Sequence, residues 1–274
     1  MPHVNANGID LYHEFHGEGP RLLFVNGSGA TLATTGMMLE PYSSRFEVLA
    51  YDQRGLGRTS IPDGPYEMAD YAADAAALLD AVGWDTCAVT GTSFGGMVAQ
   101  EFAVTFPERV ERLALVCTSP GGDFASYPLH TLADLPPEEA IALGPKLLDT
   151  RFTPEWLAEH DDDRAVADMM SAMRTAEKPD DVRRGETAQL DARSRLDVLD
   201  RLANITCPTL VASGRYDGIA PPRNGAEIAA RVPGAQLRLY EGGHLFMMQD
   251  ARAMPDILDF LAGADPTELR GDTE

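Results

Sequence analysis

The sequence predicts an α/β fold: a mostly parallel, doubly wound sheet with helices on both faces and a helical cap inserted after the sixth strand. Short continuous apolar runs, typical of strands buried on both faces, alternate with helical patterns over the first 119 residues. Strand signal nearly disappears between residues 120 and 203, and the alternation then returns. We therefore expect a core of residues 1–119 and 204–274 and a cap of residues 120–203.

The first elements follow from local patterns. The stretch HVNANGIDLYHEF places Asn-Gly between two alternating runs, which predicts a β-hairpin. The apolar runs RLLFVNG, FEVLAYD, TCAVT and RLALVCTS predict buried strands. The Ala- and Leu-rich stretch ADYAADAAALLDAVG predicts a helix that ends at Gly83.

The second half combines the cap with the end of the core. The stretches PPEEAIALGPKLL, PEWLAEH, RAVADMMSAM and SRLDVLDRL predict cap helices. The core then resumes with a strand at PTLVASG, a helix at NGAEIAARV, a strand at AQLRLY and a helix at MPDILDFLAG. We expect the polar tail after Gly263 to fray.

Composition narrows the class of protein. The net charge of −21 opposes binding to nucleic acid or to anionic membranes. No segment approaches eighteen consecutive apolar residues and no signal peptide stands out, so we expect a cytoplasmic enzyme with a small-molecule substrate, and a homo-oligomer stays open. Cys87, Cys117 and Cys207 are expected to be buried reduced thiols, since their spacings match no zinc pattern.

The stretch VTGTSFGGMVAQEF places Ser93 on a tight turn between a strand and a helix. Gly91 and Gly95 flank it where a side chain would collide with the neighbouring element. Gly-x-Ser-x-Gly also occurs in plain glycine-rich turns, but the strand–turn–helix context favours a nucleophile, because it lifts the hydroxyl out of the sheet. Such a serine requires a base, an orienting acid and an oxyanion hole.

Partners for Ser93 are expected directly after strands, because ligands of open α/β sheets bind beyond the carboxyl ends of the strands. Asp217 follows the run PTLVASG, and His244 follows the run AQLRLY. Taken alone, Asp217 is more typical of a turn beside Gly218, and His244 competes with five other histidines. Their chain order, serine then aspartate then histidine, is known from hydrolase sheets, so the three are the predicted catalytic residues.

The oxyanion hole requires two backbone N–H groups. Phe94, directly after the nucleophile, is the first candidate. The second is Ser28 in the loop NGSGAT, for which a plain turn is the alternative interpretation.

Five stretches together resemble the α/β-hydrolase superfamily over nearly the whole chain: VNGSGA, YDQRGLGRTS, GTSFGG, GRYDGIAPP and EGGHLFM. The resemblance implies that Ser93, Asp217 and His244 are nucleophile, acid and histidine. It also implies that Asp52 and Arg54 shape a loop near the site and do no chemistry. One departure is Asn26, which stands before Gly27 where the family usually has histidine, and which affects how the oxyanion loop is anchored.

This resemblance implies two-step acyl transfer by a serine esterase or enol-lactonase-like enzyme, acting on a small ester or lactone without cofactor or metal; the methionines described below favour an apolar one. A serine at the turn disfavours the dehalogenase and epoxide-hydrolase branches, which use aspartate there. A carbon–carbon bond hydrolase of ring-cleavage diketones and a cofactor-free perhydrolase or haloperoxidase stay open on the same triad. A non-catalytic ligand receptor is disfavoured, because a pure binder has no need of all three groups.

Methionines suggest an apolar substrate pocket at the seam between cap and core. Flexible thioethers suit an irregular apolar cavity, although the same residues would also serve as ordinary core. The expected pocket residues are Asn26, Leu245, Phe246, Met169, Met170 and Met173.

Overall fold

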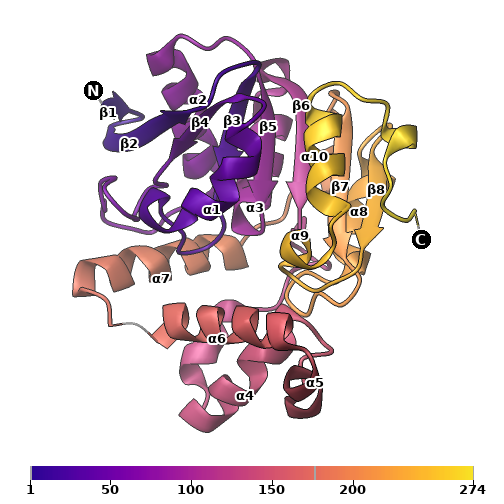
Figure 1. Cartoon of the computed structure of the whole chain (residues 1–274). Coiled ribbons are helices and arrows are strands. Elements are labelled where there is room, and N and C mark those ends of the chain that lie inside the picture. Colours follow the sequence, from indigo (N-terminus) through magenta and orange to yellow (C-terminus); the bar gives the residue numbers. More distant parts are fainter. Residues whose placement is uncertain (1, 176, 274) are drawn as a thin grey trace.

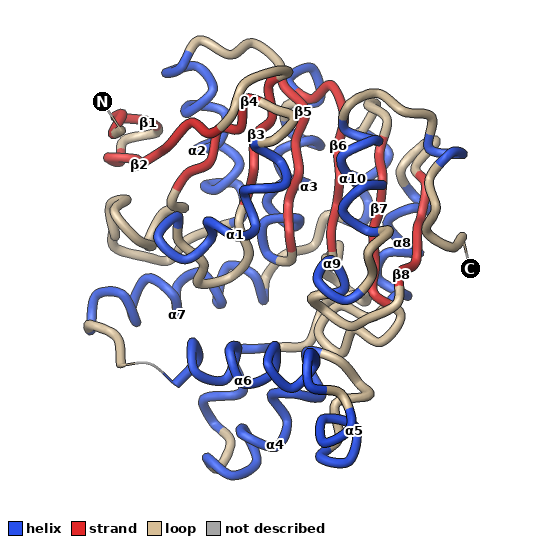
Figure 2. The backbone as a smooth tube through the Cα atoms, viewed as in Figure 1, coloured by secondary structure: helices blue, strands red, loops and turns tan. Residues whose placement is uncertain are grey.

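The computed structural model describes residues 2–175 and 177–273, apart from the side chains of Ala133, Pro137, Met173, Arg174, Thr175 and Pro266. Within it, eight strands form one sheet in the order β1-β2-β4-β3-β5-β6-β7-β8 (Figures 1 and 2). The strands β1 and β2 pair antiparallel, as do β2 and β4, and every later pair is parallel. The strands are His3–Ala6, Ile9–His16, Arg21–Val25, Glu47–Tyr51, Cys87–Thr92, Val110–Val116, Thr209–Gly214 and Gln236–Tyr240.

The N-terminal hairpin forms where the Asn-Gly signal predicts it. Asn7 has φ 49° and Gly8 has φ 77°, so both central residues of the turn are left-handed. This geometry matches the twist of the two flanking strands and explains why asparagine and glycine occupy the turn.

Helices cover both faces of the sheet, which confirms the doubly wound arrangement. The helices α2, α3 and α8 bury their apolar side chains in one core cluster, and α1 and α10 bury theirs in a second cluster on the opposite face. Their bounds are Leu32–Ser43 for α1, Met68–Val82 for α2, Phe94–Thr105 for α3, Pro222–Arg231 for α8 and Ala253–Leu261 for α10. All three cysteines are buried and unpaired, as expected.

The segment between β6 and β7 is helical. It contains α4, α5, α6 and α7, with α4 and α5 packed against α6 (Figure 1). These four helices, called the cap helices below, span Pro137–Leu148, Pro154–Glu159, Asp161–Thr175 and Asp180–Ser194. No helix in the described part of the chain is long and apolar enough to cross a membrane.

Two details of the cap differ from the sequence expectation. The stretch SRLDVLDRL was expected to be a helix, but it leaves α7 at Ser194, makes an isolated bridge at Asp197 and then forms a short 3-10 helix, Leu199–Asn204. The helix α7 itself carries almost no apolar periodicity and is held by tertiary contacts instead. Gly185 of α7 lies so close to the core that a Cβ there would be 1.9 Å from the Gly55 carbonyl oxygen.

Candidate active site

Ser93 sits in a strained turn between β5 and α3. Its backbone has φ 56° and ψ −116°, outside the regions that L-residues ordinarily occupy. The turn is held on both sides, since the Ser93 N–H donates to the Val116 carbonyl at 2.8 Å and the Thr118 hydroxyl donates to the Ser93 carbonyl at 2.7 Å. The strain is therefore maintained by β6, the next strand in the sheet.

The two flanking glycines are required by close backbone approach. A Cβ at Gly91 would lie 2.2 Å from the Gly95 carbonyl oxygen, and one at Gly95 would lie 2.0 Å from the Val25 carbonyl oxygen. Both obstacles are backbone atoms, which cannot rotate away. Glycine at these positions thus lets α3 start directly against the end of β3.

We expect Gly95→Ala to destabilise the protein by about 3 kcal/mol or more, because β3 and α3 must separate to admit the methyl group. Gly36→Ala is the matched control, since Gly36 lies inside α1 with nothing within 4 Å of its Cβ position. That control should stabilise by roughly 0.5–1 kcal/mol. Urea unfolding measures both changes, and wild-type stability of Gly95→Ala would contradict the steric argument.

The structure brings Ser93, His244 and Asp217 together from three strand ends. His244 Nε2 lies 2.9 Å from Ser93 Oγ, and His244 Nδ1 lies 2.8 Å from Asp217 Oδ2. Asp217 follows β7 and His244 follows β8, so the parallel sheet places both beside the end of β5. The imidazole thus has one nitrogen for the hydroxyl and one for the carboxylate.

Backbone contacts orient this hydrogen-bonded chain. Asp217 Oδ1 accepts N–H groups of Ile219 and Ala220, each at 2.8 Å, which leaves Oδ2 for the imidazole. The loop that carries His244 approaches β7 so closely that a Cβ at Gly214 would lie 2.1 Å from the Gly243 carbonyl oxygen. The carboxylate and the imidazole are therefore both buried and preorganised.

The electrostatics of the pair predict the pH dependence of catalysis. Burial lowers the pKa of His244, but the Asp217 carboxylate outweighs burial, so the net pKa lies above the ordinary 6.5. A histidine base must be neutral to accept a proton. We expect kcat/KM for an uncharged ester to rise with pH through a midpoint above 6.5, measured from pH 5 to 10. A flat profile from about pH 5 to 8 with rate-limiting chemistry would contradict a histidine base.

The predicted oxyanion donors lie beside Ser93. Phe94 is the first residue of α3, where backbone N–H groups lack an acceptor within the helix. A Cβ placed on Gly27 would lie 3.7 Å from Ser93 Cβ, so the loop that carries Ser28 runs next to the nucleophile. Its position suits two N–H groups that converge on one developing negative charge.

Asn26 anchors the loop after β3 through its side chain and its backbone. Its buried amide nitrogen donates to Thr35 Oγ1 at 2.9 Å, which ties the loop to α1. Its carbonyl accepts the Gln53 side-chain amide, also at 2.9 Å. The Asn26 side chain therefore fixes the loop after β3 to α1.

Asp52 and Arg54 tie the loop after β4 to two neighbouring helices. The Asp52 carboxylate accepts the N–H groups of Leu32 at 2.7 Å and Arg58 at 2.9 Å. Arg54 makes a two-point ion pair with buried Asp74, with both nitrogen–oxygen distances at 2.7 Å. These contacts hold the loop after β4 against α1 and α2.

The structure corrects part of the expected apolar pocket. Phe246 is fully buried in the core, where its ring stacks on Tyr240 with centroids 5.2 Å apart, so it serves as a core residue. The expectation fails because α9, Phe246–Gln249, turns directly after the loop of His244 and directs this ring back to the sheet. Leu245 stands at the start of that short helix and is half-buried.

Met169 and Met170 of α6 line neither of two cavities in the described part of the chain, one beside α6 and one beside α7. Met169 is 38% exposed and Met170 is half-buried. The Met173 side chain lies outside the described residues. Their expected role in a pocket therefore gains no support from their positions.

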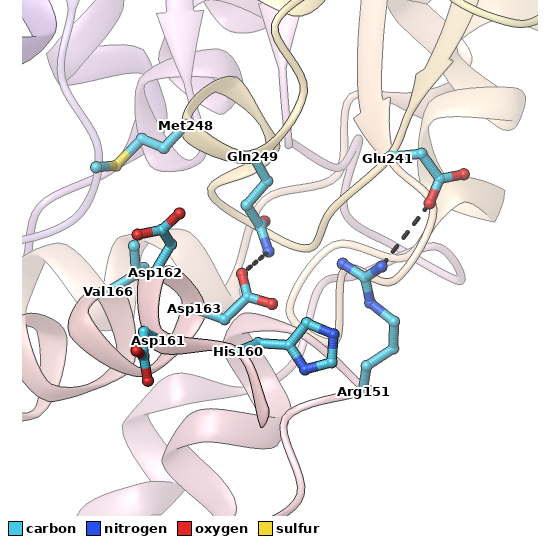
Figure 3. Close-up of a pocket in the computed structure, with 9 residues that line it drawn as sticks. All are labelled: Arg151, His160, Asp161, Asp162, Asp163, Val166, Glu241, Met248 and Gln249. Atoms are coloured by element: carbon cyan, nitrogen blue, oxygen red, sulfur yellow. Dashed lines mark hydrogen bonds and ion pairs between the residues drawn. The ribbon is translucent and has the colours of Figure 1, made fainter. Parts of the chain in front are cut away.

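The larger cavity, of about 340 Å³, opens between α6 and the loop after β8 (Figure 3). Gln249 joins the two sides, since its amide nitrogen lies 3.1 Å from Asp163 of α6 and its amide oxygen accepts the Gly243 N–H at 2.9 Å. The rim is acidic, and Ser93 is not part of it. Its lining residues are Arg151, His160, Asp161, Asp162, Asp163, Val166, Glu241, Met248 and Gln249.

Two polar residues of α7 reach the site region without any signal in the sequence. Gln189 Oε1 accepts the Gly29 N–H of the loop after β3 at 2.8 Å. Arg193 donates from Nη2 to Ser126 Oγ at 2.8 Å. Both side chains are buried, although they belong to a helix that resembles a polar surface segment. Among the described residues, no group of three or more His, Cys, Asp or Glu is arranged to hold a metal ion.

Comparison with known proteins agrees with this architecture. A family model described as the alpha/beta hydrolase fold matches residues 20–251. The chain is 28% identical over 265 residues to a proposed carbamate hydrolase, RutD, of Azorhizobium caulinodans, with 94% of this chain and 96% of that protein covered. It is 32% identical over 250 residues to the poly(3-hydroxyalkanoate) depolymerase of Ectopseudomonas oleovorans, with 88% and 83% covered.

A solved structure with the same fold is the enol-lactonase from Burkholderia xenovorans LB400. The TM-score is 0.78 and the sequence identity is 26%, with 95% of this chain and all of that chain covered. The chain therefore belongs to the α/β-hydrolase fold family and is a hydrolase.

Proposed function

We propose that this hydrolase cleaves small esters or lactones by acyl transfer to Ser93. The observation that carries the proposal is the unbroken hydrogen-bonded chain from Ser93 Oγ through His244 to Asp217. Relatives that are named as a depolymerase of a polyester and as an enol-lactonase support the same substrate class. The substrate is a small molecule that reaches the carboxyl ends of the strands.

In the first step, Ser93 Oγ attacks the substrate carbonyl while His244 Nε2 accepts its proton. The carbonyl oxygen gains negative charge, which the N–H groups of Phe94 and Ser28 stabilise. When the tetrahedral intermediate collapses, the acyl C–O bond breaks and His244 returns the proton to the leaving alcohol. For a lactone, this alcohol stays attached to the acyl group.

In the second step, water attacks the acyl-enzyme and loses a proton to His244 Nε2. Collapse of this intermediate releases the carboxylic acid and restores the Ser93 hydroxyl. Asp217 holds Nδ1–H throughout, so Nε2 is free to accept a proton in each half-reaction, and its negative charge stabilises the imidazolium.

A pre-steady-state burst tests this proposal. With p-nitrophenyl acetate, acylation releases nitrophenol before the slower deacylation, so the burst should equal the enzyme concentration and the intact mass should rise by one acetyl group. A panel of esters, lactones, carbamates and ring-cleavage diketones then ranks the substrate classes. Turnover of diketones alone, without an acetyl adduct, would overturn the proposal in favour of carbon–carbon bond hydrolysis.

A further inference from the structure

The helix α7 crosses the end of the strand that carries Ser93. Gln189 of α7 bonds Gly29 in the loop after β3, and Arg193, one turn later, bonds Ser126 in the segment after β6. In the sheet, β5 lies between β3 and β6. Residues four apart share one face of a helix, so this face of α7 spans the end of β5, where Ser93 stands. Figure 1 shows α7 running between the sheet and α6.

This face holds buried hydrogen-bond donors that have no acceptor in the described part of the chain. They are Nε and Nη1 of Arg193, with three N–H groups between them, and Nε2 of Gln189. The buried hydroxyl of Ser28, next to the oxyanion loop contact of Gln189, is also without a partner. Buried donors are almost always satisfied, so unpaired donors on one face of a helix indicate a missing acceptor.

The positive charge of Arg193 indicates that the missing acceptor is negatively charged. The side chain is 6% exposed, and no carboxylate of the described residues lies within ion-pair distance of it, although the chain has 43 acidic residues. Asp217 attracts it from further away, but the oxygens of that carboxylate are engaged with His244 and two backbone amides. A buried guanidinium without a counter-ion is costly to fold, so its retention requires a use.

A small cavity adjoins this guanidinium. Its volume is about 80 Å³, and it lies between α7 and the segment that follows β6. Its lining includes Arg193, His130 and three serines, Ser119, Ser126 and Ser194, together with apolar residues such as Leu129 and Leu190. A group that carries only acceptors and one negative charge matches these surroundings, and a planar carboxylate is the group that guanidinium binds with two parallel hydrogen bonds.

We propose that Arg193 and Gln189 bind a carboxylate carried by the substrate, so that the enzyme hydrolyses esters or lactones that bear a free acid. This inference rests on the proposed function, because it names the substrate class of the same site. The negative surface charge does not oppose it, since the local field at a buried arginine acts at contact distance, while surface charges are screened within about 8 Å at physiological salt. Arg193 is thus a specificity-determining residue.

The test compares anionic and neutral substrates of the same shape. The methyl monoesters of succinate and glutarate are assayed against the methyl esters of succinamic and glutaramic acid, in which an uncharged amide replaces the carboxylate. For at least one linker length, wild-type kcat/KM should favour the acid by about 10- to 100-fold, the range expected for hydrogen bonds to a charged group. Equal rates for acid and amide at both lengths would overturn the inference.

Variants distinguish a role of Arg193 in substrate binding from a role in protein stability. Arg193→Gln should bring the acid-to-amide ratio close to one, Arg193→Lys should restore part of it, and Arg184→Gln is the control. Arg184 belongs to the same helix, but its side chain is 58% exposed. Arg193→Gln should also keep or raise the melting temperature, because it removes an unpaired buried charge. A lowered melting temperature with an unchanged ratio would assign Arg193 a purely structural role.

Covalent labelling distinguishes failure of this inference from failure of the proposed function. An uncharged fluorophosphonate should label wild-type enzyme, and millimolar succinate should slow that labelling in the wild type and in Arg184→Gln but not in Arg193→Gln. Absence of labelling would refute the serine mechanism itself. Labelling that succinate does not slow, together with equal turnover of acid and amide, would refute only the carboxylate site.

Discussion

Replacement of Ser93 by alanine is expected to lower kcat by about 10⁶-fold and to abolish labelling by a fluorophosphonate. The substitution removes the one atom that forms the bond to the acyl group, the Oγ that lies 2.9 Å from His244 Nε2. The conformation of the turn should stay the same, because the backbone of residue 93 is held by hydrogen bonds to Val116 and Thr118. Steady-state kinetics and intact-mass spectrometry measure the two effects.

Ser44→Ala is the matched control for this experiment. Ser44 is exposed at the end of α1, where its hydroxyl donates only to the Pro41 carbonyl. Its replacement should leave both turnover and labelling at the wild-type level. Labelling that persists in Ser93→Ala at the wild-type rate would assign the nucleophile to another residue and end the proposed mechanism.

Replacement of Asp217 by asparagine is expected to lower kcat by about 10⁴-fold while the protein stays folded. An asparagine that keeps the N–H groups of Ile219 and Ala220 on its oxygen turns its NH₂ toward His244 Nδ1. Nδ1 must then accept a hydrogen bond, which places the proton on Nε2, the nitrogen that should take it from Ser93. The residual activity should also show a lower pH midpoint, because the carboxylate no longer raises the pKa of His244.

Asp256→Asn separates this effect from the general consequence of altering a buried carboxylate. Asp256 is 1% exposed and accepts the N–H groups of Arg270 and Gly271, each at 2.7 Å. It also accepts the Tyr240 hydroxyl of β8 at 3.1 Å, whereas the His244 imidazole bonds Asp217 and Ser93, so the variant should lose stability and keep kcat/KM within a few-fold of the wild type. Near-normal turnover by Asp217→Asn would show that another carboxylate orients the imidazole.

Most of the core could be predicted from the sequence because its signals are local. The Asn-Gly turn of β1 and β2, the apolar runs of the parallel strands and the glycine that ends α2 each act within a few residues. The tight turn at Ser93 is also predicted by a local signal, the two flanking glycines Gly91 and Gly95. The parallel topology then implies that residues after β7 and β8 lie near the end of β5.

In the cap, α4, α5 and α6 form where the sequence predicts helices, but α7 was not predicted, because tertiary contacts hold it. The helix α7 has no continuous apolar stripe, so periodicity does not find it, and its buried positions include Gly185, Gln189 and Arg193. Phe246 shows the converse error: an apolar residue near His244 suggests a pocket, but a single turn of helix decides that its ring stacks on Tyr240.

The sequence by itself determined the succession of strands and helices in the core, the tight turn at Ser93 and the candidates Asp217 and His244. Each of these depends on a local backbone conformation or on the topology of parallel strands. Only the tertiary structure decided that Asn26 is anchored by Thr35, and that Gln189 and Arg193 bond to the segments after β3 and β6, the two neighbours of β5 in the sheet. The physical reason is that a hydrogen bond between residues far apart in the chain, such as the one from Gly29 to Gln189, leaves no periodic trace in either segment.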